Sequence, residues 1–550
     1  MPEPLIRAFE ARDYDGVRAG FRWPEPARLN IATEICSRWA AAEPERIALI
    51  QLGADGVVTK WPYGALEEKS NRLANALRAH GLARGDRCAV LLPQSAEAAL
   101  THLAVYKLGA VALPLFTLFG EDGLAFRLED AGARMLVTDR ANLPKVLAIR
   151  DRLPALETVF CVDGFPEAKP EGVLGFWDEL EKGAAGVEPA EIGPEDPAFI
   201  CYTSGTTGPP KGAMHGHRVL LGHLPGVQMW LEGVPKPGDV AWTPADWAWM
   251  GGLCNMMMPA LHYGIPLVAH RMAKFEPEQA FGILERFGVT VGFLPPTALK
   301  MMRTVRNPER FDLKLRAIGS GGESLGAGLL DWGRSALGLT VNEFYGQTEC
   351  NLVLTNNGAI MPAKPGSMGR ATPGCEMAVI DSDGAALPAG ETGEIAVRRP
   401  HPALFLEYWG RPDATADKFV GDWMRTGDEG RMDEDGYFFF NARTDDVISS
   451  AGYRIGPGEV EDCLTGHPAV AMAGVIGVPD DLRGEAVKAY VVLREGEIGD
   501  KALVEDLQAH VKTRLSPHEY PREIAFIKAL PMTATGKIMR RELKRRRADG

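Results

Sequence analysis

Apolar and polar positions alternate in blocks along the first two thirds of the chain. Short apolar runs of strand length recur between longer segments with helical periodicity, such as residues 66–80 and 276–287. This alternation predicts an α/β fold of layered subdomains with a largely parallel sheet. The runs that we interpret as buried strands lie at residues 88–92, 135–138, 158–162, 198–202, 289–294 and 315–318.

The pattern changes near residue 370. Short strands at residues 394–397 and 437–440 alternate there with Asp/Gly turns, which predicts a β-rich subdomain.

Beyond about residue 446 the chain has its own α+β pattern. Residues 470–478 and 486–493 are predicted strands, and residues 501–515 place apolar side chains on one helical face. We therefore predict an N-terminal domain of residues 1–444 and a small C-terminal domain of residues 445–550.

The segment between Asp246 and Arg271 contains no Asp, Glu, Lys or Arg. It is nevertheless broken by glycines and prolines, and it carries Asn255 and His262. A membrane-spanning helix needs about twenty mainly apolar residues. We therefore interpret the segment as buried core and pocket wall, and we predict no integral membrane segment.

Composition narrows the classes of function. Hydrophobic residues make up 45% of the 550 residues, and the net charge of −13 argues against a general nucleic-acid binder. The basic run at residues 544–547 is interpreted as a solvated tail. The eight cysteines form no C-x-x-C pair and the N-terminus has no signal-peptide pattern, so we predict a cytoplasmic protein with reduced thiols.

A loop rich in small residues follows the predicted strand at 198–202. Such a loop exposes backbone N–H groups and hydroxyls, and a lysine near its end supplies positive charge, which together suit a polyphosphate. It departs from the P-loop pattern, because Pro210 and Gly212 stand where that pattern needs Gly and Ser or Thr. The candidate phosphate-binding residues are Thr203, Ser204, Gly205, Thr206, Thr207, Gly208 and Lys211.

This loop instead resembles the phosphate loop of the adenylate-forming enzymes, the superfamily of acyl-CoA synthetases, luciferases and nonribosomal-peptide adenylation domains. Further segments resemble the motifs of that family in the same order, over roughly residues 30–545. They are Gly321, Gly322, Glu323 and Ser324; Glu343, Phe344, Tyr345, Gly346, Gln347, Thr348 and Glu349; Asp428; Arg443 and Asp445; Ala451, Gly452, Tyr453 and Arg454; and Lys537.

The resemblance implies roles for these residues. The turn at 322–324 and the segment at 343–348 would surround the adenine, and Glu349 would hold Mg²⁺, a cation that prefers carboxylates and water. Asp428 would accept the ribose hydroxyls, while Arg443 and Arg454 would also contact ATP. The C-terminal domain would be mobile and would rotate at Asp445. Ala451, Gly452 and Tyr453 would line the path of the CoA pantetheine.

The implied reaction has two steps. A carboxylic acid attacks ATP to form an acyl-AMP with release of pyrophosphate, and CoA then takes the acyl group. Catalysis of this kind depends on positioning and charge stabilisation. By resemblance, Thr206 and Lys211 would bind the phosphates, and Lys537 would stabilise the charge that develops during adenylation. The substrates are therefore a small carboxylic acid, ATP and CoA.

The acyl pocket is predicted to be larger than acetate needs. Acetate-specific relatives carry a tryptophan that plugs the pocket, where this chain has Gly346. The other predicted wall residues are Trp249, Met250, Gly251 and Gly321, and none is charged. Together with a tail motif at 518–522 that looks like those of medium-chain and benzoate-type synthetases, this favours a medium-chain or aromatic acid. Substitution of Gly346 by tryptophan is expected to shift preference toward acetate or propionate.

Other interpretations remain open from the sequence alone. A stand-alone ligase that loads an acyl carrier protein would share the motifs, and a non-catalytic nucleotide-binding protein is a second alternative. His215 and His217 suggest a metal pair, but they are also explained as neighbours of the phosphate loop. The oligomeric state is open between a monomer and a homodimer.

Overall fold

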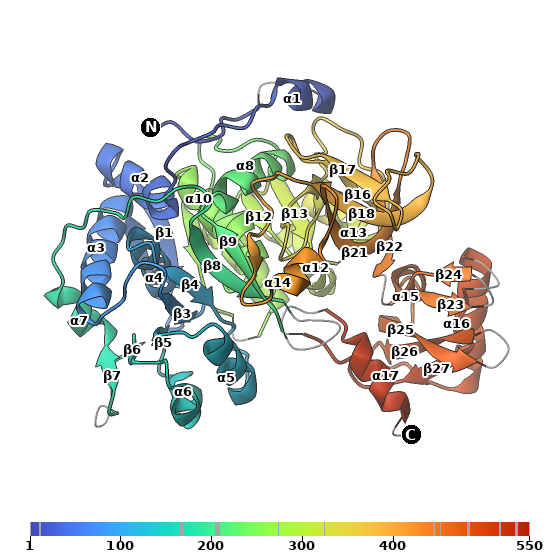
Figure 1. Cartoon of the computed structure of the whole chain (residues 1–550). Helices are drawn as coiled ribbons and strands as arrows, with labels where there is room; N and C mark the ends of the chain where they lie inside the picture. Colours follow the sequence, from blue (N-terminus) through green and yellow to red (C-terminus); the bar gives the residue numbers. More distant parts are fainter. Residues whose placement is uncertain are drawn as a thin grey trace.

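The computed structural model has a large N-terminal part and a small C-terminal domain beside it (Figure 1). The structure describes residues 2–9, 13–165, 170–203, 210–272, 274–323, 325–443, 446–450, 453–480, 484–515, 519–533 and 537–548. Of residues 449, 453, 454, 484, 547 and 548 it describes the backbone alone.

One sheet of the large part is mostly parallel and contains the strand that precedes the phosphate loop. Its order is β19-β9-β8-β4-β3-β5-β6-β7, with parallel pairing from β8 to β7 and antiparallel pairing of β9 with both β8 and β19. The strands are β3 (Arg87–Leu91), β4 (Val111–Pro114), β5 (Met135–Thr138), β6 (Thr158–Cys161), β7 (Val173–Gly175), β8 (Pro197–Tyr202), β9 (Gly212–Gly216) and β19 (Glu407–Tyr408).

The second sheet joins parallel strands to the β-rich subdomain. Its order is β17-β18-β21-β22-β16-β15-β14-β13-β12-β10-β11-β1-β2, with β20 against β21. Pairing is parallel from β1 through β11, β10, β12 and β13 to β14, and antiparallel beyond β14. The strands are β1 (Ile47–Leu52), β2 (Val58–Pro62), β10 (Ala241–Trp242), β11 (Leu267–Ala269), β12 (Val291–Phe293), β13 (Ala317–Gly321), β14 (Val341–Tyr345), β15 (Leu354–Thr355), β16 (Ser367–Ala371), β17 (Met377–Ile380), β18 (Thr392–Arg398), β20 (Phe419–Val420), β21 (Trp423–Met432) and β22 (Phe438–Arg443). The predicted α/β class and the β-rich subdomain are confirmed.

Helices pack on and between these sheets. Helices α4 and α8 are buried along almost their whole length, in a core shared by the two sheets. The helices of the large part are α1 (Tyr14–Gly20), η1 (Thr33–Ser37), α2 (Arg38–Ala42), α3 (Tyr63–Ala79), α4 (Ala96–Lys107), α5 (Glu121–Asp130), α6 (Leu143–Ala148), η2 (Arg150–Arg152), α7 (Phe176–Lys182), α8 (Val219–Trp230), α9 (Met250–Gly252), η3 (Leu253–Met257), α10 (Met258–His262), α11 (Pro277–Arg286), α12 (Pro296–Met302), η4 (Pro308–Arg310), α13 (Ala327–Trp332), η5 (Gly333–Leu337) and α14 (Pro412–Ala416).

The uncharged segment after Asp246 forms α9, η3, α10 and β11, all buried in this core. The interpretation as core is thus confirmed. Among the described residues, no helix combines the length and apolar character that crossing a bilayer requires.

The C-terminal domain is built on a third sheet, ordered β24-β23-β26-β25, with β27 parallel to β26. Helices α15 and α16 pack over its core, and the predicted strands and helix of this region are confirmed. The elements are β23 (Ile448–Ser450), β24 (Tyr453–Ile455), α15 (Pro457–Thr465), β25 (Val470–Asp480), β26 (Gly484–Leu493), α16 (Lys501–Arg514), β27 (Glu523–Phe526) and α17 (Arg540–Ala548).

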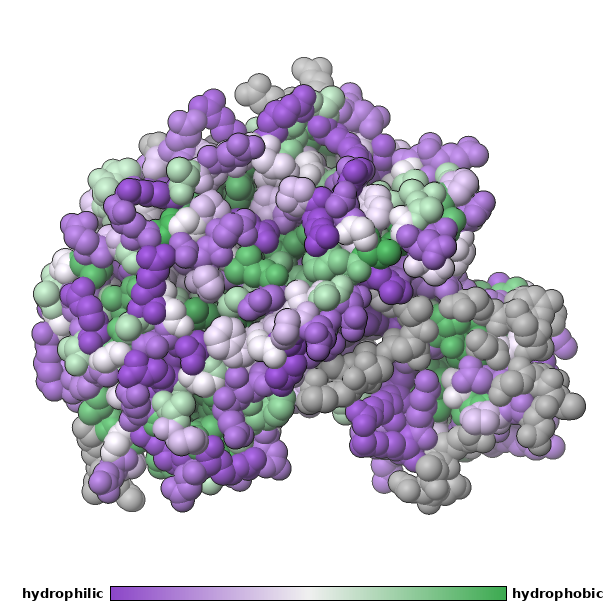
Figure 2. Space-filling model, viewed as in Figure 1, coloured by the Kyte–Doolittle hydropathy of each residue, from purple (hydrophilic) through white to green (hydrophobic). Residues whose placement is uncertain are grey.

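The basic run at 544–547 is part of a helix and does not form the tail that the sequence suggested. It belongs to α17, which the fully buried Leu543 anchors to the domain. Figure 2 shows a strongly hydrophilic surface over this helix. Arg540, at the start of the helix, adds ion pairs with Glu461 and Asp446, so the helix is anchored although most of its residues are charged.

Candidate active site

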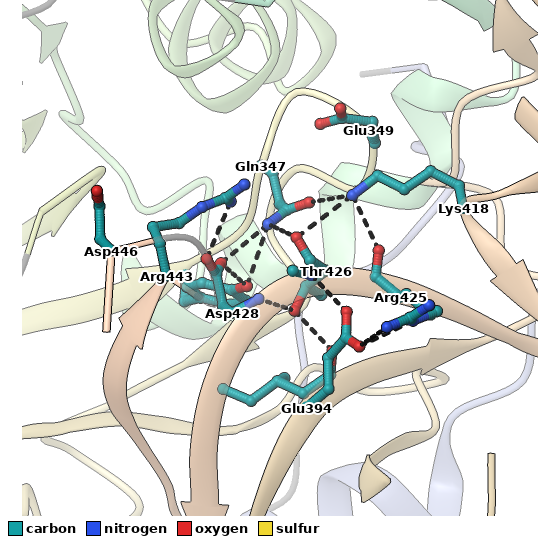
Figure 3. A network of polar contacts seen from close by, with 12 residues as sticks. Gln347, Glu349, Glu394, Lys418, Arg425, Thr426, Asp428, Arg443 and Asp446 are labelled. Atoms are coloured by element: carbon teal, nitrogen blue, oxygen red, sulfur yellow. Dashed lines mark hydrogen bonds and ion pairs between the residues drawn. The ribbon is translucent and has the colours of Figure 1, made fainter. Parts of the chain in front are cut away.

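The carboxylate of Asp428 lies at the centre of a polar cluster between β14, β21 and β22 (Figure 3). Its Oδ1 accepts a hydrogen bond from Arg443 Nη1 at 2.9 Å, and its Oδ2 accepts from Gln347 Nε2 at 2.9 Å and from the Tyr345 hydroxyl. Asp428 is only 4% exposed. A carboxylate has about four acceptor positions, so three protein donors fix its orientation and leave room for a ligand hydroxyl.

A second layer of contacts holds this cluster in place, and the sequence did not point to it. Thr426 Oγ1 donates to Ile395 O at 2.6 Å, and Glu394 accepts from the backbone N–H of Gly427 at 2.7 Å. Lys418 Nζ donates to Gln347 Oε1 at 3.3 Å and to Arg425 O at 2.9 Å (Figure 3). Thr426 borders the Asp428 motif, but Glu394 and Lys418 belong to distant segments without a recognisable pattern.

Glu349 lies on the phosphate-loop side of the site. It is 8% exposed, and its Oε1 accepts a short hydrogen bond from the Tyr408 hydroxyl. Tyr408 is on β19, beside β9, and the ammonium of Lys211 lies 4.8 Å from the centre of its ring. The backbone N–H of Thr203 donates to Lys211 O at 2.9 Å, which closes the base of the loop. Glu349 and Lys211 are therefore joined through one tyrosine that the sequence analysis missed.

Lys537 reaches this cluster from the C-terminal domain. The residue keeps solvent access, yet both domains surround it closely enough that desolvation lowers its pKa. The nearby carboxylates of Asp428, Glu323 and Glu349 act in the opposite direction and raise that pKa. The backbone N–H of Lys537 donates to Thr533 Oγ1 at 3.0 Å, and the Thr533 N–H donates to Lys537 O at 2.8 Å, so two hydrogen bonds to Thr533 position the lysine backbone.

An aromatic wall lies on the other side of the turn that follows β13. Gly322 has φ of +101°, and a Cβ there would lie 3.0 Å from the Trp249 ring. The Trp249 ring also packs against Phe293 at 5.6 Å between centroids, and a Cβ on Gly251 would lie 2.7 Å from Phe293. Both glycines are therefore required by close contact with aromatic rings.

Phe344 points away from the Asp428 cluster, whereas its neighbour Glu343 lies on the opposite face of β14, the face of Tyr345. Phe344 stacks on Trp230 at 5.4 Å and tilts against Phe293 at 5.2 Å, and a Cβ on Gly321 would lie 2.6 Å from the Phe344 ring. Glu343 is buried and accepts from Leu325 N at 3.3 Å, and desolvation raises its pKa to about 8. Phe344 thus extends the aromatic wall, and Glu343 is held by the backbone at Leu325, after the turn that follows β13.

Gly346 does not leave space for a side chain. A Cβ there would lie 2.3 Å from the backbone N of Leu352 and 2.8 Å from Asn351 Cα. A tryptophan at this position would displace that backbone before it filled any pocket. The substitution proposed from the sequence is therefore not a clean test of pocket size in this chain.

His215 and His217 are part of the core beneath the phosphate loop. His217 Nδ1 accepts from the backbone N–H of Ile31 at 3.1 Å, and the His215 ring stacks on Phe199 at 5.0 Å. Desolvation lowers the pKa of each to about 3, so both are neutral. Within the described part of the chain, no group of three or more His, Cys, Asp or Glu side chains is arranged to hold a metal ion.

Several predicted residues fall outside the described parts of the chain. These are Ser204, Gly205, Thr206, Thr207, Gly208, Ser324, Asp445, Ala451 and Gly452. The backbones of Tyr453 and Arg454 lie on β24, and Thr348 lies in the loop between Gln347 and Glu349.

Comparison with known proteins identifies the class. The family model of the AMP-binding enzyme matches residues 36–409, and that of the AMP-binding enzyme C-terminal domain matches residues 459–537. The chain therefore belongs to the AMP-binding enzyme family, as an AMP-forming acid–CoA ligase. Such a ligase uses ATP to form an acyl-AMP and then transfers the acyl group to CoA.

Similarity to individual relatives extends over nearly the whole chain. An uncharacterized acyl–CoA ligase of Bacillus subtilis, YtcI, is 36% identical, with 95% of this chain and 96% of that protein covered. Acetyl-coenzyme A synthetase of the same organism is 35% identical, with 97% and 95% covered. The crystal structure of the anthranilate CoA ligase AuaEII in complex with anthranoyl-AMP superposes with a TM-score of 0.87 at 29% identity, with 96% and 99% covered. Two of these relatives are named for different acids, so similarity alone leaves the acid open.

Proposed function

We propose that this ligase activates a medium-chain or aromatic carboxylic acid, larger than acetate, and that Lys537 acts in the adenylation step. The observation that carries the proposal is the approach of Lys537 to Asp428 and Glu349, which are contributed by different elements of the large part. A cation at that place would stabilise the negative charge that develops as the substrate carboxylate attacks the α-phosphorus and pyrophosphate departs.

The nucleotide would lie across the Asp428 cluster. Asp428 would accept the ribose hydroxyls at the acceptor positions that Tyr345, Gln347 and Arg443 leave free. Lys211, together with Thr206 and Thr207 of the loop, would bind the phosphates. Arg443 and Arg454 would add positive charge. The paired state of Asp428 supports this, because a preoriented carboxylate loses little entropy when a hydroxyl binds.

Glu349 is the residue that would hold Mg²⁺. Magnesium is bound by one or two carboxylates together with water and substrate phosphates, and a single buried carboxylate beside the phosphate loop fits that requirement. When bound, the ion would neutralise phosphate charge. The Tyr408 hydroxyl fixes the direction of the Glu349 carboxylate, and Lys211 lies over the same tyrosine ring.

The second step would use a different face of the C-terminal domain. Rotation at Asp445 would replace the Lys537 turn with the segment at Ala451, Gly452 and Tyr453, along which the CoA pantetheine would pass. The CoA thiol would then attack the acyl carbonyl, and AMP would leave.

The acid would lie against Trp249, Met250, Gly251 and Gly321. The described contacts of this wall are aromatic or apolar, and Phe293 and Phe344 extend it. A wall without charge suits an alkyl chain or ring, and it disfavours an ammonium group that would need a carboxylate partner. The same substrate range suggests a place in fatty acid or aromatic acid metabolism. The eight unpaired cysteines support a cytoplasmic location.

A panel of carboxylic acids from acetate to medium-chain and aromatic acids tests the proposal by AMP release with and without CoA. We expect the highest kcat/KM with a medium-chain or aromatic acid and a requirement for CoA. A highest kcat/KM with acetate would contradict the acid assignment. Turnover with an acyl carrier protein in place of CoA would favour the carrier-loading ligase.

A further inference from the structure

Three buried polar side chains meet behind the aromatic wall. His223 lies on α8, Asn255 on η3, and Asn351 two residues after Glu349. Asn351 Nδ2 is 2.8 Å from His223 Nε2 and 2.7 Å from Asn255 Oδ1. His223 and Asn255 have no exposed surface, and Asn351 is 8% exposed. Polar side chains so deep in an acyl-binding region require an explanation.

The hydrogen bonds fix the direction of each donor. His223 Nδ1 is 2.6 Å from Val219 O, which can only accept, so Nδ1 carries the proton. Desolvation lowers the His223 pKa to about 4, so the ring is neutral and Nε2 is an acceptor. Asn351 therefore donates one Nδ2 hydrogen to His223 and the other to Asn255 Oδ1.

Asn255 is left with an amide NH₂ that has no acceptor. Its Oδ1 is occupied by Asn351, and its Nδ2 is buried without a hydrogen-bond partner in the described part of the structure. Leaving a buried donor unpaired is destabilising. Such a cost is tolerated where a ligand supplies the missing acceptor.

Asn255 lines a narrow buried hollow that has no room for a water molecule in this structure. The other lining side chains are apolar, apart from Tyr263, whose hydroxyl already donates to Ile6 O at 3.0 Å. Because no water molecule fits there in this structure, bridging water does not pair the Asn255 amide. Met256 also lines the hollow, and its flexible side chain allows the narrow space to widen.

The hollow lies beside the predicted acyl wall, along the same strand and helical segment. Val291 lines it, and Phe293, two residues further along β12, faces the same side of the sheet and contacts Trp249. Asn255 itself follows Trp249, Met250 and Gly251 on the next helical turns. An acid whose carboxylate lies near Lys537 would thus have its distal end directed toward Asn255.

We propose that Asn255 is a specificity-determining residue that donates a hydrogen bond to an oxygen acceptor at the distal end of the acid. The preferred substrates would then be medium-chain or aromatic acids with a distal hydroxyl, ether or carbonyl oxygen. This inference rests on the proposed function, because it assigns a feature of the acid that the ligase activates. His223 and Asn351 are positioning residues that orient the Asn255 amide.

The test compares pairs of acids of equal size that differ in one distal oxygen. Suitable pairs are para-methoxybenzoate with para-ethylbenzoate, the corresponding meta pair, and a medium-chain keto acid with its alkyl analogue. For the wild-type enzyme we expect kcat/KM to be roughly tenfold or more higher for the oxygenated member of at least one pair. Equal values within every pair would overturn the inference, and would mean that Asn255 has a structural role only or binds water.

The Asn255→Leu variant tests whether Asn255 is responsible for the preference for the oxygenated acid. It should lose the preference within that pair while it keeps turnover of the alkyl member, which also shows that the variant is folded. Met256→Leu, a similar change at a neighbouring lining position that retains the amide, should keep the preference. A preference that persists in Asn255→Leu would overturn the assignment. Absence of AMP release with every acid would instead contradict the proposed function itself.

Discussion

The two sides of the candidate site are built from different kinds of interaction. On the nucleotide side, ionised groups are paired before any substrate binds, as Asp428 is with Arg443. On the acyl side, aromatic rings and neutral amides form the wall, and His223 is uncharged because burial lowers its pKa. The charged cluster would orient the nucleotide, which is common to the whole family, whereas the neutral wall would distinguish acids by shape and by single hydrogen bonds.

Replacement of Lys537 should have the largest effect, and only on adenylation. Lys537→Ala removes the cation beside Asp428 and Glu349, so we expect acyl-AMP formation to slow by roughly a hundredfold to a thousandfold. Thioester formation from supplied acyl-AMP should remain near the wild-type rate. Single-turnover assays of each half-reaction measure both, with Lys528→Ala, an exposed lysine of the same domain, as the control. Equal loss in both half-reactions would contradict the role.

Asp428→Asn should act mainly on ATP binding. The amide keeps the size of the side chain but removes the charge that Arg443 pairs with, and its NH₂ cannot accept a ribose hydroxyl. We expect KM for ATP to rise roughly tenfold or more, with little change in KM for the acid. Asp433→Asn, which removes a carboxylate paired with Lys364, is the matched control. If only KM for the acid rose, Asp428 would act on the acid and not on the nucleotide, which would contradict the prediction.

The contrast between the two sides of the site also explains which parts of it could be predicted from the sequence. Asp428, Arg443 and Glu349 stand in short segments that resemble family motifs, so their roles on the nucleotide side were predicted from the resemblance and stay predictions. The contact that blocks a side chain at Gly346 comes from the backbone at 351–352, which no spacing rule describes. Tyr408 and Lys418 join the site through β19 and the start of β20, across long sequence separations.

The fold was more predictable than the pocket. Strands such as β5 and β25 were recognisable because complete burial gives a continuous apolar run. Strand β13 begins two residues later than predicted, since apolar residues before it also pack in the core although they lie outside the sheet. Helix α17 was not predicted because most of its residues are charged. Among its described side chains, only that of Leu543 is buried.

Tyr408→Phe should produce a smaller loss than the change at Asp428. It removes the hydroxyl that donates to Glu349 and keeps the ring beneath Lys211. A single such hydrogen bond contributes about 1–2 kcal/mol, so we expect adenylation to fall about tenfold and the Mg²⁺ concentration for half-maximal rate to rise. Titration of Mg²⁺ in a pyrophosphate-exchange assay measures this. Tyr437→Phe, whose hydroxyl contacts Pro362 O far from the site, should change neither quantity.

The pH dependence should show the smallest effect. It separates the contribution of the positive charge of residue 537 from that of the shape of its side chain. Desolvation lowers the pKa of Lys537 below the ordinary value of 10.5, so the protonated form is lost at a lower pH than for a free lysine. The wild-type adenylation rate should therefore decline as pH rises toward 10.5 from below. Lys537→Arg keeps its charge over this whole range, so its rate, although lower at neutral pH, should not show that decline. Pyrophosphate exchange measured across the range with both enzymes gives the comparison. Parallel declines would mean that another group, and not the ammonium of Lys537, limits the reaction at alkaline pH.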